Sequence, residues 1–322
     1  MALGHETMLR KDIQRVVETL HHEEISVRPY ADQYRSLLDN HGKMIRASLV
    51  LVFARADASD PARDTLDERV ITAAAAIEML HLATLVHDDV LDGAPIRRNE
   101  PTVQTVLGNK TAIYLGDLIL SRYMQIMADI APDLAFIREQ SSTLREIVTG
   151  ELLQESVRHQ TTTTVDHYMQ AIGGKTAALF RLACLTGLRL TADPPEETWI
   201  RAASEFGDHL GTAFQIVDDI DDFDLSHDTG KPKLEDVSDG IYTLPVLLAL
   251  REQPSFSHTL ESDNPHAVLD YLCAHPETMR QSRDIALWHV QEARDALTTI
   301  PLSSGVKAML TDMLERFSRT IH

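Results

Sequence analysis

The sequence predicts a single all-α domain spanning residues 1–322. Apolar residues make up 43% of the chain and aromatic residues only 5%, with alanine and leucine dominating the apolar set. This balance favours helices over a β-sandwich or barrel. Nearly every long segment repeats its apolar residues with the period of a helix, and no segment alternates convincingly with the period of a strand.

The expected helices follow one another along the chain with short polar connections. The most apolar of them ends at Gly93 and Pro95, which are residues that stop helices. The run of threonines at 161–164 is typical of a helix N-cap. The periodicity predicts helices over 7–22, 28–40, 43–56, 69–92, 103–130, 133–159, 164–188 and 196–223, with the last helices from about 241 onward.

Charge and cysteine content exclude several classes of protein. The net charge of −19 argues against a nucleic-acid-binding surface and against a polybasic membrane patch. Cys184 and Cys273 stand alone, which favours a reducing compartment over a disulfide framework. The first residues resemble no signal peptide, and no run approaches 18 uninterrupted apolar residues. We therefore expect a cytoplasmic protein with at most peripheral membrane contact.

Two acidic clusters with identical spacing indicate a functional site. "LVHDDVLDG" places Asp88, Asp89 and Asp92 at the end of an apolar helix. Like charges one turn apart repel, and a helix C-terminus disfavours carboxylates. One such cluster is most simply a solvated helix end. "FQIVDDIDDFD" repeats the pattern, however, with Asp218, Asp219 and Asp222, so that a shared function explains the pair better.

The clusters have the chemistry of a magnesium site. Carboxylates at i and i+4 lie on one helical face, and two such faces opposed across a cavity would form a cage of oxygen ligands. Mg²⁺ takes a few carboxylates and completes its octahedron with water and phosphate oxygens. A calcium-binding EF-hand loop starting at Asp222 fails, because His227 and Lys233 occupy the positions that require glycine and glutamate. The histidines and cysteines lack the spacing of a zinc site.

Basic residues near these helices suggest a diphosphate ligand. Lysine and arginine clamps acting with Mg²⁺ are what a diphosphate requires. Each basic residue alone is more simply explained as a solvated surface residue, except Arg97 and Arg98, which follow five residues after the first cluster. The candidates are Lys43, Arg46, Arg97, Arg98, Lys175 and Lys231.

Taken in order, the motifs resemble the trans-polyprenyl diphosphate synthases, a family of class I isoprenoid synthases. The likeness runs from about Gly42 to Pro245. It is carried by "GKMIR", "EMLHLATLVHDDVLDGAPIRRNEPTV", "GNKTAIYLGDLIL", "GELLQ", "GGKTAALF", "FQIVDDIDDF", "GKP" and "DGIYTLPVLLAL". The resemblance implies helices around a deep central cavity, a homodimer, and three Mg²⁺ ions.

The resemblance also implies a reaction and a role for each motif residue. An allylic diphosphate would lose its diphosphate, the double bond of isopentenyl diphosphate would attack the resulting cation, and a proton would be lost. The implied metal ligands are Asp88, Asp89, Asp92, Asp218, Asp219 and Asp222. Arg97, Lys175 and Lys231 would hold the allylic diphosphate, and Lys43, Arg46, His81 and Arg98 would hold isopentenyl diphosphate. Thr176 and Gln215 would stabilise the cation, so that catalysis falls to Asp88, Asp89, Asp92, Lys175, Thr176, Gln215 and Asp218.

Product length is predicted from the residues upstream of the first cluster. In this family, short-chain enzymes usually block the product tunnel with an aromatic residue near Ala83. Here the side chains are small at Ala83 and Ala76, with Thr84 beside them and Leu80 as a partial floor. We expect a hexa- to octaprenyl product for a quinone side chain, although alanines also simply permit close helix packing.

Several alternatives remain open at the level of sequence. Met44, Ala47 and Ile241 depart from the residues that are more common in the family, so one phosphate contact in each half of the site would be lost or replaced. A short-chain farnesyl or geranylgeranyl diphosphate synthase is the first alternative. The chain could also be the catalytic subunit of a heteromeric synthase with a second, non-homologous subunit. A terpene cyclase, a head-to-head synthase or a non-catalytic regulatory subunit fits less well, because all six aspartates and "GKMIR" are present.

Overall fold

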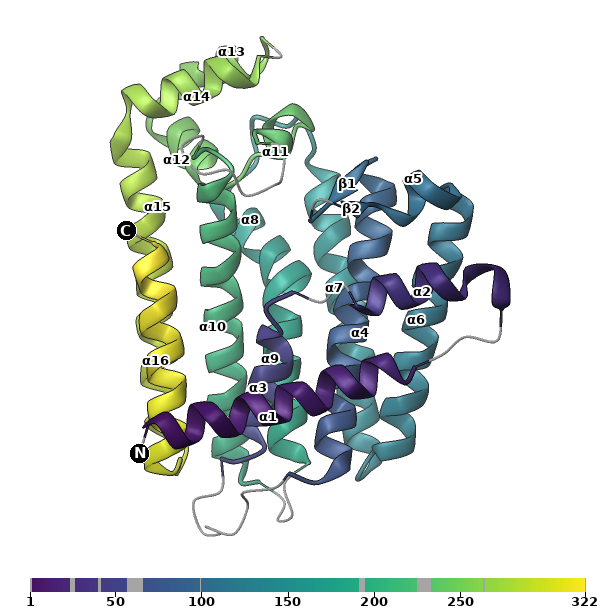
Figure 1. Ribbon diagram of the computed structural model, residues 1–322. Helices are drawn as coiled ribbons and strands as arrows, with labels where there is room; N and C mark the ends of the chain where they lie inside the picture. The colour runs from purple at the N-terminus through teal and green to yellow at the C-terminus, as the bar shows by residue number, and fades with distance from the viewer. Residues whose placement is uncertain are drawn as a thin grey trace. The chain divides into compact units, whose positions relative to one another are not determined.

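A computed structural model describes most of the chain as helix (Figure 1). It describes residues 2–23, 27–39, 42–56, 66–98, 100–190, 195–224, 233–262 and 264–321. The α-helices in these ranges are α1 (Ala2–His21), α2 (Ala31–Asp39), α3 (Ile45–Phe53), α4 (Glu68–Leu91), α5 (Val103–Leu107), α6 (Asn109–Ile130), α7 (Leu134–Ser156), α8 (Val165–Ile172), α9 (Ala178–Arg189), α10 (Glu197–Asp221), α11 (Glu235–Ser238), α12 (Leu244–Glu252), α13 (Ser257–Leu260), α14 (Pro265–Ala274), α15 (Pro276–Ala296) and α16 (Ser304–Thr320). Short helical turns are η1 (Arg28–Tyr30), η2 (Gly173–Ala177) and η3 (Pro254–Phe256).

Three local features differ from the sequence prediction. A two-residue antiparallel pair, β1 (Ile96–Arg97) and β2 (Glu100–Pro101), forms in the loop where we expected no strand. The helix expected over 103–130 is interrupted at Gly108, whose φ of 81° cannot continue a helix. The helix expected over 164–188 contains a π-helical turn, η2, between α8 and α9. All three lie in or beside motifs quoted above, where local geometry overrides simple periodicity.

The chain divides into two compact units, and each is built from three separate segments. Unit 1 comprises Met1–Ser141, Leu182–Ser204 and Leu297–Thr311. Unit 2 comprises Ser142–Arg181, Glu205–Ala296 and Asp312–His322. The boundaries fall inside α7, α9, α10 and α16, so the units are not successive domains along the sequence. The single domain over 1–322 remains a prediction.

Unit 1 is organised around α4. This helix packs against α6 and α3, and α1 contacts α2, α3 and α4 (Figure 1). A Cβ on Gly116 of α6 would lie 2.5 Å from Nε2 of His87 on α4, so the glycine leaves room for the His87 ring between the two helices. Among the described helices, α4 alone has the length and mean hydropathy of a membrane span, yet 61% of that stretch is buried inside the protein, as in a core helix.

In unit 2, an arginine on α9 links this helix to α7 and α10, and α10 packs closely against η2. Arg181 of α9 donates to Asp208 of α10 at 2.7 Å and also pairs with Glu146 of α7. A Cβ on Gly211 would lie 2.5 Å from Cα of Ala177, so α10 passes directly against η2. Elsewhere in the unit, α12 packs against α8, α14 and α15. These contacts fix the segments that carry the second acidic cluster.

Candidate functional site

The first acidic cluster, at the C-terminal end of α4 in unit 1, has one buried and two more accessible carboxylates. Asp89 is 5% exposed, whereas Asp88 is half-buried and Asp92 is exposed. Nε of Arg97 donates to Oδ1 of Asp89 at 2.6 Å. Burial raises the pKa of Asp89, and the ion pair with Arg97 opposes that rise. The hairpin β1–β2 therefore places Arg97 beside Asp89, the middle aspartate of the cluster.

A basic pocket lies on the same helix, further toward its N-terminus. It is lined by Gly42, Glu78, His81 and Arg98 together with leucines and Met79. Burial lowers the pKa of His81 well below its ordinary value, and the charges of Arg46, Arg98 and Arg97 lower it further. His81 is therefore neutral at pH 7 and is surrounded by cations. The structure thus brings together His81, Arg46 and Arg98, three residues expected to hold isopentenyl diphosphate, whereas Lys43 is exposed just before α3.

The residues expected to set product length lie in the core of unit 1. Ala76, Leu80 and Ala83 are each at most 1% exposed, while Thr84 is half-buried and donates to the carbonyl of His81 at 2.8 Å. His87 lies against α6, with Nε2 3.2 Å from Oδ1 of Asp117. The assignment of a product tunnel along these alanines stays a prediction.

The π turn η2 in unit 2 carries Lys175 and Thr176. Glycines allow it to touch α7, because a Cβ on Gly174 would lie 2.6 Å from the carbonyl oxygen of Glu146. Nζ of Lys175 lies 3.1 Å from Oε2 of Glu151, which belongs to the "GELLQ" motif. A π turn inserts one residue into a helix and often marks a functional site.

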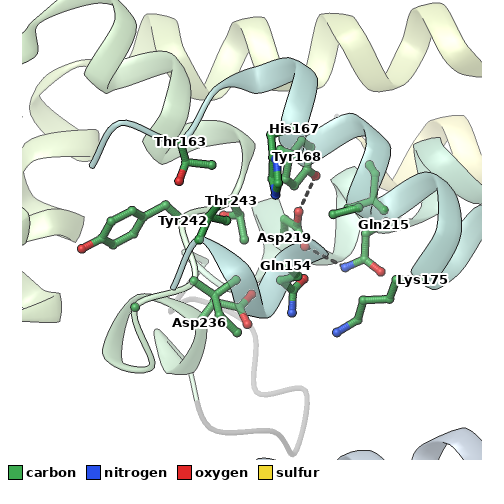
Figure 2. Close-up of a pocket in the computed structure, with 15 residues that line it drawn as sticks. Gln154, Thr163, His167, Tyr168, Lys175, Gln215, Asp219, Asp236, Tyr242 and Thr243 are labelled. Atoms are coloured by element: carbon green, nitrogen blue, oxygen red, sulfur yellow. Dashed lines mark hydrogen bonds between the residues drawn. The ribbon is translucent and has the colours of Figure 1, made fainter. Parts of the chain in front are cut away.

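The second acidic cluster ends α10 and, like the first, buries its middle aspartate, whereas the exposure of the two outer aspartates is reversed. Asp219 is 3% exposed, Asp222 is half-buried and Asp218 is exposed. Figure 2 shows Asp219 between two donors, the hydroxyl of Tyr168 at 2.5 Å and Nε2 of Gln215 at 2.8 Å. Gln215 in turn accepts a hydrogen bond from Oγ1 of Thr176 at 2.5 Å. Thr176 and Gln215, predicted to act together, are therefore adjacent.

Two residues just before α11, Lys233 and Leu234, contact the end of α10. Oδ1 of Asp222 accepts from the backbone N–H of Leu234 at 3.0 Å, and Leu234 has a φ of 61°. Nζ of Lys233 donates to the carbonyl of Asp221 at 2.6 Å. Lys231, predicted to bind the allylic diphosphate, lies outside the described residues.

Asp236 of α11 was missed at the level of sequence. It lines a pocket together with Tyr168, Lys175 and Asp219 (Figure 2). Burial, followed by the neighbouring charges of Asp219 and Asp222, raises the pKa of Asp236 to about 8. Burial likewise raises the pKa of Asp219, against the hydrogen bonds from Tyr168 and Gln215. Only its acidic character distinguished Asp236 within a segment that resembled a loop.

The departure at position 241 also lies in this pocket. Ile241 is half-buried and lines it, with its backbone N–H donating to the carbonyl of Asp236 at 2.7 Å. Tyr168 and Glu78, to which the sequence assigned no role although Glu78 begins a quoted motif, also line the two pockets. Their sequence positions look like ordinary helix faces, so only the fold reveals them.

The carboxylates fit a magnesium ion by their chemistry. Each cluster places hard oxygen donors at a partly accessible helix end, and the raised pKa values of Asp89 and Asp219 show that burial opposes their charge. A divalent cation would relieve that opposition. Within the described part of the chain, no three His, Cys, Asp or Glu side chains already converge as a metal site. Water and substrate phosphate would therefore supply the remaining ligands, as Mg²⁺ prefers.

A family model described as polyprenyl synthetase matches residues 28–269, which is most of the chain. This chain belongs to the polyprenyl synthetase family. The family resemblance stated from the motifs is confirmed, and so is the predicted enzyme class: the protein is a prenyltransferase of this family. The family depends on Mg²⁺, in agreement with the predicted cofactor.

Individual relatives support the same conclusion. The chain is 41% identical over 179 residues to an all-trans-nonaprenyl-diphosphate synthase (geranyl-diphosphate specific) of Rhodobacter capsulatus, a match that covers 55% of this chain and only about half, 54%, of that relative. It is 35% identical over 226 residues to heptaprenyl diphosphate synthase component 2 of Geobacillus stearothermophilus, covering 70% of this chain and 68% of the relative. The solved structure of a decaprenyl diphosphate synthase from Rhodobacter capsulatus matches with a TM-score of 0.85 at 28% identity, covering 99% of each chain. The predicted all-α isoprenoid synthase fold is thus confirmed.

Proposed function

We propose that the protein condenses isopentenyl diphosphate with an allylic diphosphate to make an all-trans polyprenyl diphosphate of medium to long chain. The observation that supports this proposal is the group of arginines near His81 in unit 1. In a chain of net charge −19, a neutral His81 lies among the charges of Arg46, Arg97 and Arg98. Such a concentration of arginine in an acidic protein matches the needs of a diphosphate.

Mg²⁺ would be held by the two acidic clusters, and three ions are proposed from the family resemblance. When bound, the metal supplies Lewis-acid assistance to the leaving diphosphate. Lys175 on η2 would bind the allylic diphosphate, and the oxygens of Thr176 and Gln215 would stabilise the cation. Arg97 is proposed for the same diphosphate, which it would approach from its ion pair with Asp89.

The product is proposed to be longer than geranylgeranyl. The hexa- to octaprenyl range expected from sequence overlaps the heptaprenyl relative, while the nonaprenyl and decaprenyl relatives favour the upper end of that range and beyond. The small, buried side chains of Ala76 and Ala83 are consistent with a long tunnel. A quinone side chain is the proposed destination of the product.

Partners and location are also proposals. Exposed apolar side chains on α5 and α6, namely Val106, Ile113, Tyr114 and Leu118, favour association with a second copy of the chain. The Geobacillus relative is named as a component, which keeps a second, non-homologous subunit in consideration. The two isolated cysteines support a cytoplasmic location. The acidic charge supports a protein that binds no nucleic acid and makes at most peripheral membrane contact.

The test is incubation of the purified protein with Mg²⁺, radiolabelled isopentenyl diphosphate and geranyl, farnesyl or geranylgeranyl diphosphate in turn. Chain-length analysis should show products beyond twenty carbons, and chelation of the metal should abolish their formation. Products that stop at farnesyl or geranylgeranyl would support the short-chain alternative. No incorporation, alone or with added candidate subunits, would refute the proposal.

A further inference from the structure

Glu78 of α4 supplies the missing cap at the start of α3. Its Oε1 accepts a hydrogen bond from the backbone N–H of Ala47 at 2.8 Å. Because α3 begins at Ile45, this N–H is among the first of the helix, which have no acceptor within the helix itself. Met44, the residue before the helix, has a φ of 51° and makes no side-chain cap. A carboxylate at this end also complements the helix dipole.

The same carboxylate faces Arg98. Both side chains line the same pocket. Burial, and then the charge of Arg97, lowers the pKa of Arg98, and the charge of Glu78 opposes this lowering. The guanidinium of Arg98 rests against Gly42, where a Cβ would lie 2.5 Å from Nη2. Glu78 therefore offsets the mutual repulsion of the arginines and connects the two chain segments that carry them.

These contacts link three elements that are distant in sequence but belong to unit 1. Lys43 lies just before α3 and Arg46 lies in its first turn. The hairpin carries Arg98, and α4 carries His81 and Glu78. Since its charge is shared between an N–H at a helix start and a guanidinium, Glu78 adds little net repulsion toward an incoming anion. Its position suits the orientation of cations better than contact with substrate.

We propose that Glu78 is a positioning residue of the isopentenyl diphosphate half of the site, which fixes the start of α3 and the Arg98 guanidinium relative to each other. This inference rests on the proposed function. In this role Glu78 does not contact the reacting atoms. Because it positions residues proposed to bind isopentenyl diphosphate, its removal should weaken the binding of isopentenyl diphosphate without a comparable effect on the allylic substrate.

The experiment uses steady-state kinetics in which each substrate is varied separately. Glu78→Ala should raise the KM for isopentenyl diphosphate about tenfold, the order expected from losing a hydrogen bond to a charged group. The kcat and the KM for the allylic diphosphate should change by less than about twofold, since those contacts persist. Titration calorimetry of isopentenyl diphosphate into the protein should show the same loss of affinity.

Two further variants separate the contacts that Glu78 makes. Glu78→Gln keeps an acceptor for the Ala47 N–H but removes the charge that faces Arg98. Ala47→Pro removes the donor in the first turn of α3, where the backbone N–H has no acceptor within the helix. If the hydrogen bond matters, Ala47→Pro should raise the KM on its own but add nothing in a Glu78→Ala background, because contacting residues are not additive.

Glu68→Ala is the matched control, because it removes a glutamate from the opposite end of the same helix, where it pairs with Arg15. It should leave both KM values unchanged. Unchanged KM for isopentenyl diphosphate in Glu78→Ala, or an equal rise for both substrates, would overturn the inference. If Glu78→Ala fails to fold by circular dichroism, Glu78→Gln and Ala47→Pro decide the matter by the same criteria. A wild-type protein that incorporates no isopentenyl diphosphate would instead refute the proposed function.

Discussion

Asp89 and Asp219 occupy the same position in the two acidic clusters, and in each case the surrounding protein holds that middle carboxylate. Asp89 receives Arg97, and Asp219 receives Tyr168 and Gln215. The outer members, such as Asp92 and Asp218, are exposed. The six aspartates therefore differ in burial and in hydrogen-bond partners, although their identical spacing in the sequence suggested that they were equivalent.

At the same scale, loss of the Tyr168 hydroxyl should disturb the second cluster. Tyr168→Phe keeps the ring but removes one of the two donors to Asp219. We expect kcat to fall about tenfold, the order associated with a hydrogen bond to a charged group, and the Mg²⁺ concentration for half-maximal rate to rise. Tyr271→Phe is the control, since its hydroxyl bonds only Gln253 in the same unit. A Tyr168→Phe enzyme with wild-type magnesium dependence would contradict this role.

Helix elements position the site through close backbone contacts. Unit 2 uses glycines where η2 meets α7 and where α10 meets η2. The turn that carries Lys175 and Thr176 is thereby clamped between two helices. Small shifts of either helix should move both side chains together.

Gly174→Ala tests this clamp. Its Cβ would lie 2.6 Å from the carbonyl of Glu146 and 3.0 Å from Cα of Gly150, so a helix must move. We expect a loss of about 1–3 kcal/mol of unfolding free energy, as for an overpacked core, together with reduced kcat. The neighbouring Gly173→Ala is the control, because its Cβ would meet nothing within 4 Å. Urea unfolding and kinetics should distinguish the two, and equal stability would count against the clamp.

On α4, Ala83→Phe tests the proposed tunnel. A large ring at this buried position should stop elongation and shift the product toward shorter chains. Ala83→Val should give an intermediate distribution because it fills less volume. Chromatography of the dephosphorylated products is the measurement. If both variants keep the wild-type spectrum, the residues that set length lie elsewhere.

The long helices and the two acidic clusters could be predicted from the sequence because the patterns that indicate them are local. Periodicity located the long helices such as α4 and α10, and the repeated spacing exposed both clusters. The π turn at Gly173–Ala177 was not predictable, since its wider turn depends on glycine contacts with α7 and α10. Glu78 and Tyr168 were missed for a similar reason. Their partners, Ala47 and Asp219, are 31 and 51 residues away.

At the scale of the molecule, acid pH should destabilise the fold through a histidine pair in unit 2. Nδ1 of His209 and Nδ1 of His289 are 2.8 Å apart, so one ring donates and the other accepts. Burial, and then the charge of His209, lowers the pKa of His289 to about 4. Burial also lowers the pKa of His209, although Glu292 and Glu205 oppose this. The pair is neutral near pH 7.

The sign of the effect follows from proton uptake. Between about pH 6.5 and pH 4 the unfolded chain binds a proton at His289 that the folded chain does not, so stability falls as pH decreases through that window. His289→Gln should flatten this part of the stability–pH curve relative to wild type. The exposed His266 on α14 provides the control substitution, His266→Gln. Denaturant unfolding at several pH values would contradict the prediction if wild type and His289→Gln lose stability in parallel.

The interleaving of the two units also limits how the molecule can be divided. Each unit draws on three separated stretches of chain, and α7, α9, α10 and α16 each contribute residues to both. No contiguous part of the gene therefore encodes one unit without part of the other. A cut inside α9 between residues 181 and 182, or inside α10 between residues 204 and 205, divides both units between the two fragments. Such split versions of the protein should regain activity only when their halves are mixed.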